Sequence, residues 1–290
     1  ENNKDVIEQT LTIAARALKL KSLAVIDGWG SDKLVFHDLI THEKFKFLPN
    51  IIAVTDKILE KRMLKDGYNK RLLIVTGNPY FDHLLNIKKT FEDKEKNKIR
   101  KELKIKSNSK IILYASQPID HDYRKELGYT QKTVLKLLLE NARNLNNKNI
   151  ALIIKTHPRE DIDDINDIKW IIKNYKLKTI LNPNRDLVKL ILISDIVISQ
   201  FSTVLIESSY LDKPSISLQP GLKKEDFLIT NKLDITVPVY KKEGIIKILK
   251  KVLYDKNYLN KMAKKRKSFK IEGKSTDRVV NLVYKMLNIQ

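Results

Sequence analysis

The sequence contains no cysteine. Disulfide bonds, cysteine-ligated zinc sites and a cysteine nucleophile are therefore excluded, and the composition fits a reducing compartment. No apolar run approaches the ~18–20 residues that span a bilayer, and no segment resembles a signal peptide. The first third of the chain also has no Gly-rich turn of the kind that cradles a dinucleotide. We therefore expect a cytoplasmic chain, either soluble or peripheral at the inner face of a membrane.

Charge is strongly biased to one sign, since 56 Lys and Arg face 35 Asp and Glu and give a net charge of +21. Such an excess attracts anions such as nucleic acid, acidic lipid headgroups or phosphorylated substrates. It is equally typical of a lysine-rich proteome. The basic stretches KKRKSFK (264–270) and LKLK (18–21) do not interleave aromatic residues as a single-strand binding platform does. Nucleic acid is therefore a disfavoured partner.

Short apolar, β-branched runs alternate with helical patterns along the chain. This alternation indicates an α/β fold whose parallel strands are buried on both faces. The predicted strands are 23–26, 51–54, 72–75, 111–115, 151–154, 178–181, 196–199 and 215–218. The predicted helices include 56–66, 130–145, 162–175, 187–193, 204–211 and 276–287.

A highly charged segment interrupts this alternation and divides it into two Rossmann-type units. We predict a first unit at 1–90, a charged connecting helix at 91–108, a second unit at 109–270 and a C-terminal helix at 271–290 that packs back on the first unit. The first unit has three strand patterns, fewer than a Rossmann half normally needs, so it is short or incomplete. In the alternative interpretation, the charged helix lies on the surface of a single domain.

Polar residues follow five of the predicted strands, at the sheet edge where open α/β sheets bind ligands. These segments are VIDGWGSD with Asp27, TGNPYFD (76–82), ASQP (115–118), KTHPRED (155–161) and SQFST (199–203). Asp27-Gly28 and TGNP are also turn signals, and for TGNP we favour the turn. Glu160 and Asp161 are neighbours, but no second His joins them, so we predict no metal site.

Ser202 and Thr203 lie where a predicted strand ends and a helix begins. Their hydroxyls can cap that helix while its first N–H groups bind a phosphate. Glu207 lies one turn further on the same face and can accept hydrogen bonds from a ribose or sugar. His157 is a candidate donor to a phosphate oxygen, with the charge of Lys155 nearby. The alternatives are an ordinary N-cap with a surface Glu, and a His that only ends a strand.

Two of these segments resemble a known fold family. KTHPRED and SDIVISQFSTVLIESSYLDKPSI resemble the nucleotide-binding half of GT-B fold glycosyltransferases, in particular bacterial sialyltransferase-like enzymes and CDP-glycerol glycerophosphotransferases. IIAVTDKILEKRMLKDGYNKRLLIVTGNPYFDHLL resembles the segment entering the interdomain linker of those families and of the non-hydrolysing UDP-GlcNAc 2-epimerases. The resemblance spans roughly residues 51–220. It implies an acceptor-side unit and a nucleotide-sugar-binding unit that face each other across a cleft.

The resemblance also implies residue roles. "IDG" at 26–28 looks like half of the acidic D/E-D/E-G motif of sialyltransferase-like enzymes, in which the acid is the general base on the acceptor hydroxyl. Because Ile26 replaces the first acid, only Asp27 carries this role over, and His157 is the second catalytic candidate. The implied donor-binding residues are Ser116, Gln117, Lys155, His157, Ser202, Thr203 and Glu207.

We therefore expect a metal-independent glycosyltransferase that needs no cofactor. It would move a sugar or sugar-like group from a CMP-, CDP- or UDP-linked donor to a hydroxyl of a glycan or lipid-linked acceptor in surface glycan or cell-envelope polysaccharide synthesis. Closure of the two units would assemble the site, with Asp27 as base and His157 and Lys155 stabilising the leaving phosphate. The basic surface would suit an acidic membrane. The alternatives are a nucleotide-sugar 2-epimerase and a non-catalytic nucleotide- or nucleic-acid-binding module.

Overall fold

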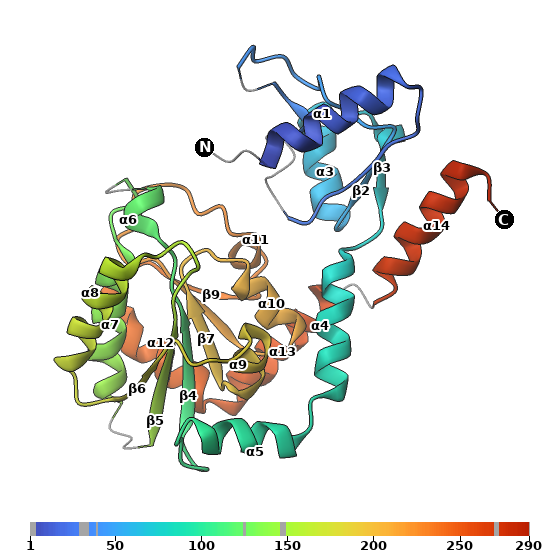
Figure 1. Ribbon diagram of the computed structural model, residues 1–290. Coiled ribbons are helices and arrows are strands. Elements are labelled where there is room, and N and C mark those ends of the chain that lie inside the picture. The colour runs from blue at the N-terminus through green and yellow to red at the C-terminus, as the bar shows by residue number, and fades with distance from the viewer. Residues whose placement is uncertain are drawn as a thin grey trace. The chain divides into compact units, whose positions relative to one another are not determined.

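The computed structural model describes residues 4–28, 35–38, 40–123, 126–145, 149–269 and 273–289. The chain forms two compact units, each built around a parallel β-sheet (Figure 1). Unit 1 comprises Glu1–Asn86 and Ile271–Gln290, and unit 2 comprises Ile87–Lys270. The predicted α/β class with two parallel-sheet units is confirmed. Among the described residues, no helix is both long and apolar enough to cross a membrane.

The described part of unit 1 has a three-stranded sheet in the order β1-β2-β3. Asp56 starts the helix after β2, because its Oδ1 accepts the backbone N–H groups of Ile58 and Leu59 at 2.8 and 2.7 Å. Leu59 and Met63 of that helix are fully buried against the sheet. The elements are α1 (Lys4–Ala17), β1 (Leu23–Val25), β2 (Ile51–Val54), α3 (Lys57–Lys65), η1 (Lys70–Leu72), β3 (Leu73–Val75), α14 (Ser275–Leu287) and α4 (Pro79–Thr90), whose last turn belongs to unit 2.

The TGNP turn after β3 is a packing site for α14. The N–H and hydroxyl of Thr276 donate to Asp82 Oδ2 at 2.8 and 3.1 Å, and Arg278 Nε donates to the Thr76 carbonyl at 2.6 Å. Gly77 has φ +86, and a Cβ built there would lie 2.3 Å from Ser275 Oγ. Only glycine fits this close approach without strain, which supports the structural interpretation of the turn.

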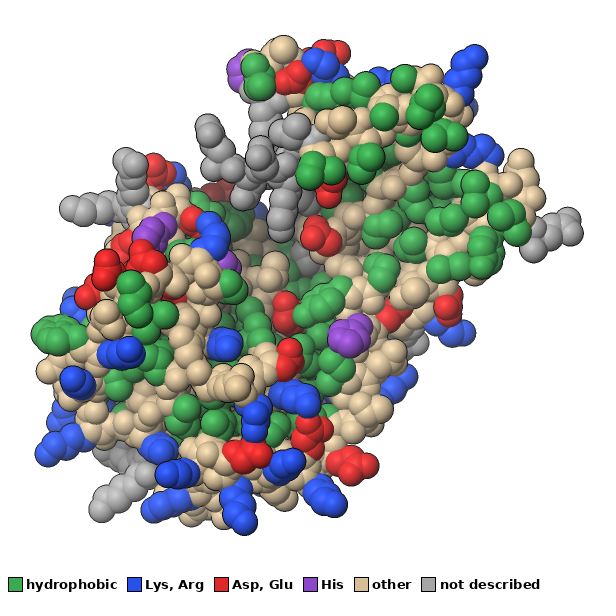
Figure 2. Space-filling model, in the orientation of Figure 1, with side chains coloured by type: hydrophobic (Ala, Val, Ile, Leu, Met, Phe, Trp, Pro, Cys, Tyr) green, Lys and Arg blue, Asp and Glu red, His purple; other side chains and the backbone are tan. Residues whose placement is uncertain are grey.

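Unit 1 also exposes large apolar side chains, and Figure 2 shows such side chains gathered over it. They lie on α1, on the turn after it and on α14. They include Ile7, Leu11, Leu18, Leu20, Tyr284 and Leu287.

Unit 2 contains a six-stranded sheet in the order β6-β5-β4-β7-β8-β9, with every pair parallel. The chain adds β5 and β6 on one side of β4, then returns to place β7 on the other side. The strand order therefore reverses between β4 and β7. The strands are β4 (Lys110–Ala115), β5 (Ile150–Lys155), β6 (Lys178–Leu181), β7 (Ile196–Ser199), β8 (Ser215–Leu218) and β9 (Val237–Val239).

Helices cover this sheet and bury its β-branched side chains in one core. α6 and α11 lie at one end of the sheet and α5 at the other (Figure 1). The helices are α5 (Asp93–Glu102), α6 (Ile119–Asp122), α7 (Gln131–Arg143), α8 (Ile162–Lys173), α9 (Leu187–Ile193), α10 (Val204–Tyr210), α11 (Ile229–Lys232), η2 (Lys242–Gly244), α12 (Ile245–Tyr254) and α13 (Lys256–Phe269).

Two sequence-based expectations differ from the structure. The segment 91–108 is helical only over α5, because Lys104 adopts φ 51 and Arg100 then donates to the carbonyls of Lys106, Ser107 and Ser109. The prediction of a helix along the whole segment is wrong. Strand β9 was not predicted, since it is three residues long with Pro238 at its centre and sits at the sheet edge where proline is tolerated.

The core of unit 2 should depend on the buried face of α8. Ile168 is 1% exposed, whereas Ile162 on the same helix is 64% exposed. We expect Ile168→Ala to lower the free energy of unfolding by about 2–5 kcal/mol, because it leaves a cavity in a packed core. Ile162→Ala is the matched control, with an expected change of about 0.5 kcal/mol or less. Urea titration followed by circular dichroism measures both, and equal effects would contradict this account of the core.

Candidate functional site

The candidate site of unit 2 lies where the strand order reverses. In open α/β sheets ligands bind outside the carboxyl ends of the strands at such a switch point. The loop after β4 carries Ser116 and Gln117, and the loop after β7 carries Ser202 and Thr203. The Gln117 Oε1 accepts the backbone N–H of Phe201 at 2.9 Å and joins the two loops. These four predicted site residues therefore flank the switch point.

The loop after β5 is held beside them by a buried acid. Ser116 is buried, and its hydroxyl donates to Glu160 Oε1 at 2.7 Å. Glu160 Oε2 accepts the backbone N–H of His157 at 2.6 Å. The Ser116 hydroxyl is thus used to position the His157 loop, so its predicted ligand contact is not supported by this geometry. Sequence reasoning assigned Glu160 no role, and its spacing three residues after His157 was the available signal.

His157 presents a neutral hydrogen-bond donor. Its Nδ1 accepts the backbone N–H of Arg159 at 3.1 Å, so the neutral ring carries its proton on Nε2. Burial and, second, the charge of Arg159 lower the pKa of His157 below 6.5, which keeps the ring uncharged at neutral pH. Lys155 ends β5 two residues earlier. Within the described ranges its ammonium makes no hydrogen bond or ion pair, so both groups are available to an anion.

The predicted capping of α10 is only partly correct. Thr203 is the N-cap residue but has helical angles, φ −56 and ψ −23, and its hydroxyl caps no N–H of the described chain. A capping hydroxyl normally needs extended backbone at this position. Ser202 Oγ instead accepts the N–H of Val204 at 3.3 Å. The exposed Thr203 hydroxyl is left open toward solvent.

Glu207 is half-buried and is not an exposed surface residue. Its Oε2 is buried and has no hydrogen-bond partner among the described residues. Burial and, second, the negative charge of Asp186 raise the pKa of Glu207 from 4.5 to about 7. A buried carboxyl oxygen without a partner is costly, so such groups call for an explanation by a ligand or water. Perturbed acids of this kind gather at functional sites.

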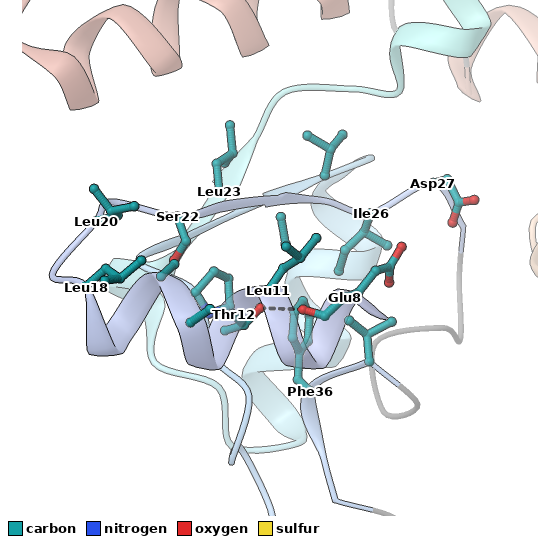
Figure 3. A pocket seen from close by; sticks show the side chains of 16 residues that line it. Glu8, Leu11, Thr12, Leu18, Leu20, Ser22, Leu23, Ile26, Asp27 and Phe36 are labelled. Carbon is teal, nitrogen blue, oxygen red and sulfur yellow. Dashed lines mark hydrogen bonds between the residues drawn. The ribbon is translucent and has the colours of Figure 1, made fainter. Parts of the chain in front are cut away.

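Asp27 lies in unit 1, directly after β1 and Ile26. Its side chain is exposed, and its carbonyl accepts the Asn78 side-chain N–H at 2.8 Å. Figure 3 shows it at the end of a pocket of about 790 Å³ whose lining is mostly apolar, including Leu11 and Leu18. Residues 29–32 of the VIDGWGSD motif lie outside the described residues.

The sequence of the chain is similar to those of known proteins. A family described as CDP-glycerol:poly(glycerophosphate) glycerophosphotransferase matches residues 53–285. The chain belongs to this family. A curated relative, UDP-N-acetylglucosamine 2-epimerase of Campylobacter jejuni, is 23% identical over 240 residues, which cover 79% of the chain and 58% of that protein. The chain thus spans less than two thirds of the length of that relative.

Solved structures share the fold of this glycerophosphotransferase-family chain. The co-structure of S. aureus MnaA with UDP has a TM-score of 0.68 at 17% identity and covers 96% of the chain and 73% of MnaA. The wall teichoic acid polymerase TagF with CDPG has a TM-score of 0.54 at 20% identity and covers 82% of the chain and 56% of TagF. At these identities the likeness establishes the α/β, GT-B-like fold.

One expectation about metals needs correction. His121, Asp161 and Asp164 place their ligand atoms within 4.8 Å of one another, so the statement that no second His joins Asp161 is wrong. The His comes from α6, forty residues away in sequence. The three groups already have partners, because His121 Nε2 lies 2.8 Å and Lys132 Nζ 3.3 Å from Asp164 oxygens, while Asp161 caps α8. This network ties α6 to α8, so a metal is not needed to neutralise the acids.

The raised pKa of Glu207 predicts a pH-dependent stability. The folded chain holds the Glu207 proton up to about pH 7, whereas the unfolded chain releases it near 4.5. Relative to Glu207→Gln, the wild-type protein should therefore lose about 3 kcal/mol of unfolding free energy as pH rises from 4.5 to 7, and no more above that. Urea unfolding at four pH values measures this difference.

The matched control is Glu225→Gln, whose side chain is 86% exposed in the wild-type protein. It should follow the wild-type pH profile. A wild-type minus Glu207→Gln difference that stays constant across this range would show that Glu207 is not desolvated.

Proposed function

We propose that this chain carries the catalytic units of a glycosyltransferase-type enzyme. It moves a sugar or sugar-like group from a nucleotide-linked donor to an acceptor hydroxyl during synthesis of a cell-envelope or surface polymer. The observation that carries the proposal is the Oε2 of Glu207, which is buried and has no hydrogen-bond partner in the described part of the chain, on the helix that follows β7 at the switch point of unit 2. Membership of the glycerophosphotransferase family gives this site its chemical context.

Unit 2 is proposed to bind the donor. Glu207 would pair with ribose hydroxyls, which supply the hydrogen bonds that its Oε2 lacks among the described residues. The Ser202 and Thr203 hydroxyls, His157 Nε2–H and the Lys155 ammonium would face the phosphates. The titles of two similar structures name UDP with MnaA and CDPG with TagF, which supports a nucleotide-linked donor.

The transfer step needs two groups with opposite tasks. The departing nucleotide phosphate gains negative charge, which the neutral donor His157 and the cation Lys155 would stabilise without a metal ion. The attacking acceptor hydroxyl loses a proton, and the exposed carboxylate of Asp27 is the proposed base. The net charge of +21 suits an acceptor that is anionic or held at an acidic membrane surface.

A second candidate function is 2-epimerisation of a nucleotide sugar. Similarity to the C. jejuni epimerase favours it. Incubation with UDP-GlcNAc alone separates the two functions, because epimerisation needs no acceptor whereas transfer does. Formation of the C2 epimer without acceptor would replace the transferase proposal.

Nucleotide binding should depend on Glu207. In calorimetry with CMP, CDP, UDP and GDP we expect one of them to bind preferentially, and Glu207→Ala to weaken it by about 10- to 100-fold through loss of hydrogen bonds to a charged group. Glu225→Ala, at an exposed acid of the same unit, is the control and should bind as wild type does. Equal affinity of both variants for every nucleotide would remove Glu207 from the donor site.

Transfer should depend on Asp27 without a matching loss of donor binding. We expect Asp27→Asn to slow transfer by about 10²–10⁴-fold, since general-base catalysis contributes that much, while nucleotide affinity changes little. The rate is followed as nucleotide release from the preferred donor in the presence of a cell-envelope acceptor fraction. Asp277→Asn, at an exposed acid in the first turn of α14, should transfer at the wild-type rate. An Asp27→Asn enzyme with normal turnover would rule out this base.

A further inference from the structure

Three aromatic side chains from three separate loops meet at the carboxyl edge of the unit 2 sheet. Tyr123 ends α6 after β4, Phe201 follows β7, and Phe227 follows β8. The ring centroids of Tyr123 and Phe201 are 5.3 Å apart, and those of Phe201 and Phe227 are 5.1 Å apart, both in edge-on geometry. We name these three residues the aromatic cluster. Tyr123 and Phe201 are half-buried, but Phe227 remains 55% exposed.

The exposed position of Phe227 is held by its neighbours. Asp226 Oδ1 accepts the Leu228 N–H at 2.9 Å, which fixes the backbone on both sides of Phe227. Asp226 Oδ2 accepts three further hydrogen bonds from side chains of the surrounding elements. The donors are Gln219 Nε2 at 3.1 Å, Asn231 Nδ2 at 2.6 Å and the Tyr240 hydroxyl at 2.6 Å. Phe227 is therefore presented on an anchored loop, and a large apolar ring kept in this way suits a binding contact.

The aromatic cluster is connected to the candidate donor site. Phe201 directly precedes Ser202, and its N–H donates to Gln117 at 2.9 Å. Asp122, the neighbour of Tyr123, forms a bidentate pair with Arg159 at 2.7 Å for both bonds. Arg159 in turn donates its N–H to the His157 ring. The cluster thus forms one rim of the site that holds His157 and Ser202.

The chain order of the loop after β7 indicates which part of a donor would reach this rim. Glu207 lies on α10, which packs against β7 and β8, one turn after Thr203. Phe201 precedes Ser202, so it lies on the other side of the two hydroxyls along the chain from Glu207. A nucleotide with its ribose at Glu207 and its phosphates at Ser202 and Thr203 therefore directs its distal group toward Phe201 and Phe227.

We propose that the aromatic cluster is the subsite for the group attached to the distal phosphate, and that this group is a sugar ring and not glycerol. The inference rests on the proposed function. A pyranose has a broad face of C–H groups that can cover an aromatic ring and remove apolar area from water. Glycerol is short and flexible and has no such face, so Phe227 would contribute little to its binding.

Calorimetry on the full chain tests the subsite. The probes are UDP with UDP-GlcNAc, and CDP with CDP-glucose and CDP-glycerol. The bare diphosphate and the nucleotide sugar are compared in the series whose diphosphate the wild type binds more tightly, and CDP-glycerol is measured in either case. We expect Phe227→Ala to weaken nucleotide-sugar binding by about 5- to 10-fold, from loss of ring contact and buried area. Affinity for the bare diphosphate and for CDP-glycerol should change less than about twofold.

Phe227→Tyr is the matched control, because it keeps the ring and should keep the nucleotide-sugar affinity within about twofold. Since Phe227 is 55% exposed, melting temperatures of both variants should stay close to wild type.

Unchanged nucleotide-sugar binding by Phe227→Ala, beside normal binding of the diphosphate, would overturn the subsite and leave the proposed function standing. An equal loss for the diphosphate would place the base or ribose at the ring, and an equal loss for CDP-glycerol would exclude the choice of a sugar. Wild-type protein that binds no diphosphate would overturn the proposed function itself, and the subsite with it.

Discussion

The loops of the unit 2 site depend on one buried carboxyl group, that of Glu160. Its two oxygens accept the Ser116 hydroxyl at 2.7 Å and the His157 N–H at 2.6 Å, and so join the ends of β4 and β5. Burial raises the pKa of Glu160, and the two hydrogen bonds oppose that shift without cancelling it. Because a buried acceptor that loses a donor carries its full desolvation cost, both loops are held to this geometry. The His157 ring itself is oriented by the Arg159 N–H, which donates to its Nδ1 at 3.1 Å.

The same principle extends along the edge of the sheet. The Gln117 side chain reaches from the β4 loop to Phe201 after β7, and the Asp122–Arg159 pair reaches from α6 to the loop after β5. Each link joins segments distant in sequence and uses a polar group of one loop to satisfy another. Loops held by such contacts place functional groups more precisely than free loop tips do, which is what a site requires of its surroundings.

Sequence patterns were sufficient for the architecture because burial on both faces leaves a local signal. The runs at 178–181, 196–199 and 215–218 coincide with β6, β7 and β8. The sequence predicted residues of the candidate site only where they directly follow a strand. The pattern places Ser202 and His157 on loops after strands, but the contact between Ser116 and Glu160 spans 44 residues and has no local periodicity. The same holds for His121 beside Asp161 and for Phe227 beside Phe201, which only the tertiary fold brings together.

Two acids of unit 2 show why burial alone does not identify a functional carboxylate. Asp226 accepts four hydrogen bonds, and although burial opposes its charge, those bonds leave its pKa below the ordinary value. Its charge is satisfied by the protein, and its effect is to fix the loop that carries Phe227. The Oε2 of Glu207 has no partner in the described chain, and burial together with the negative charge of Asp186 raises its pKa to about 7. The protein therefore stabilises one carboxylate and leaves the other short of hydrogen bonds. A buried carboxyl oxygen without hydrogen bonds lowers the free energy of unfolding, and a ligand that supplies those bonds raises it again. Glu207, and not Asp226, is the acid of this kind, and it lies beside the switch point.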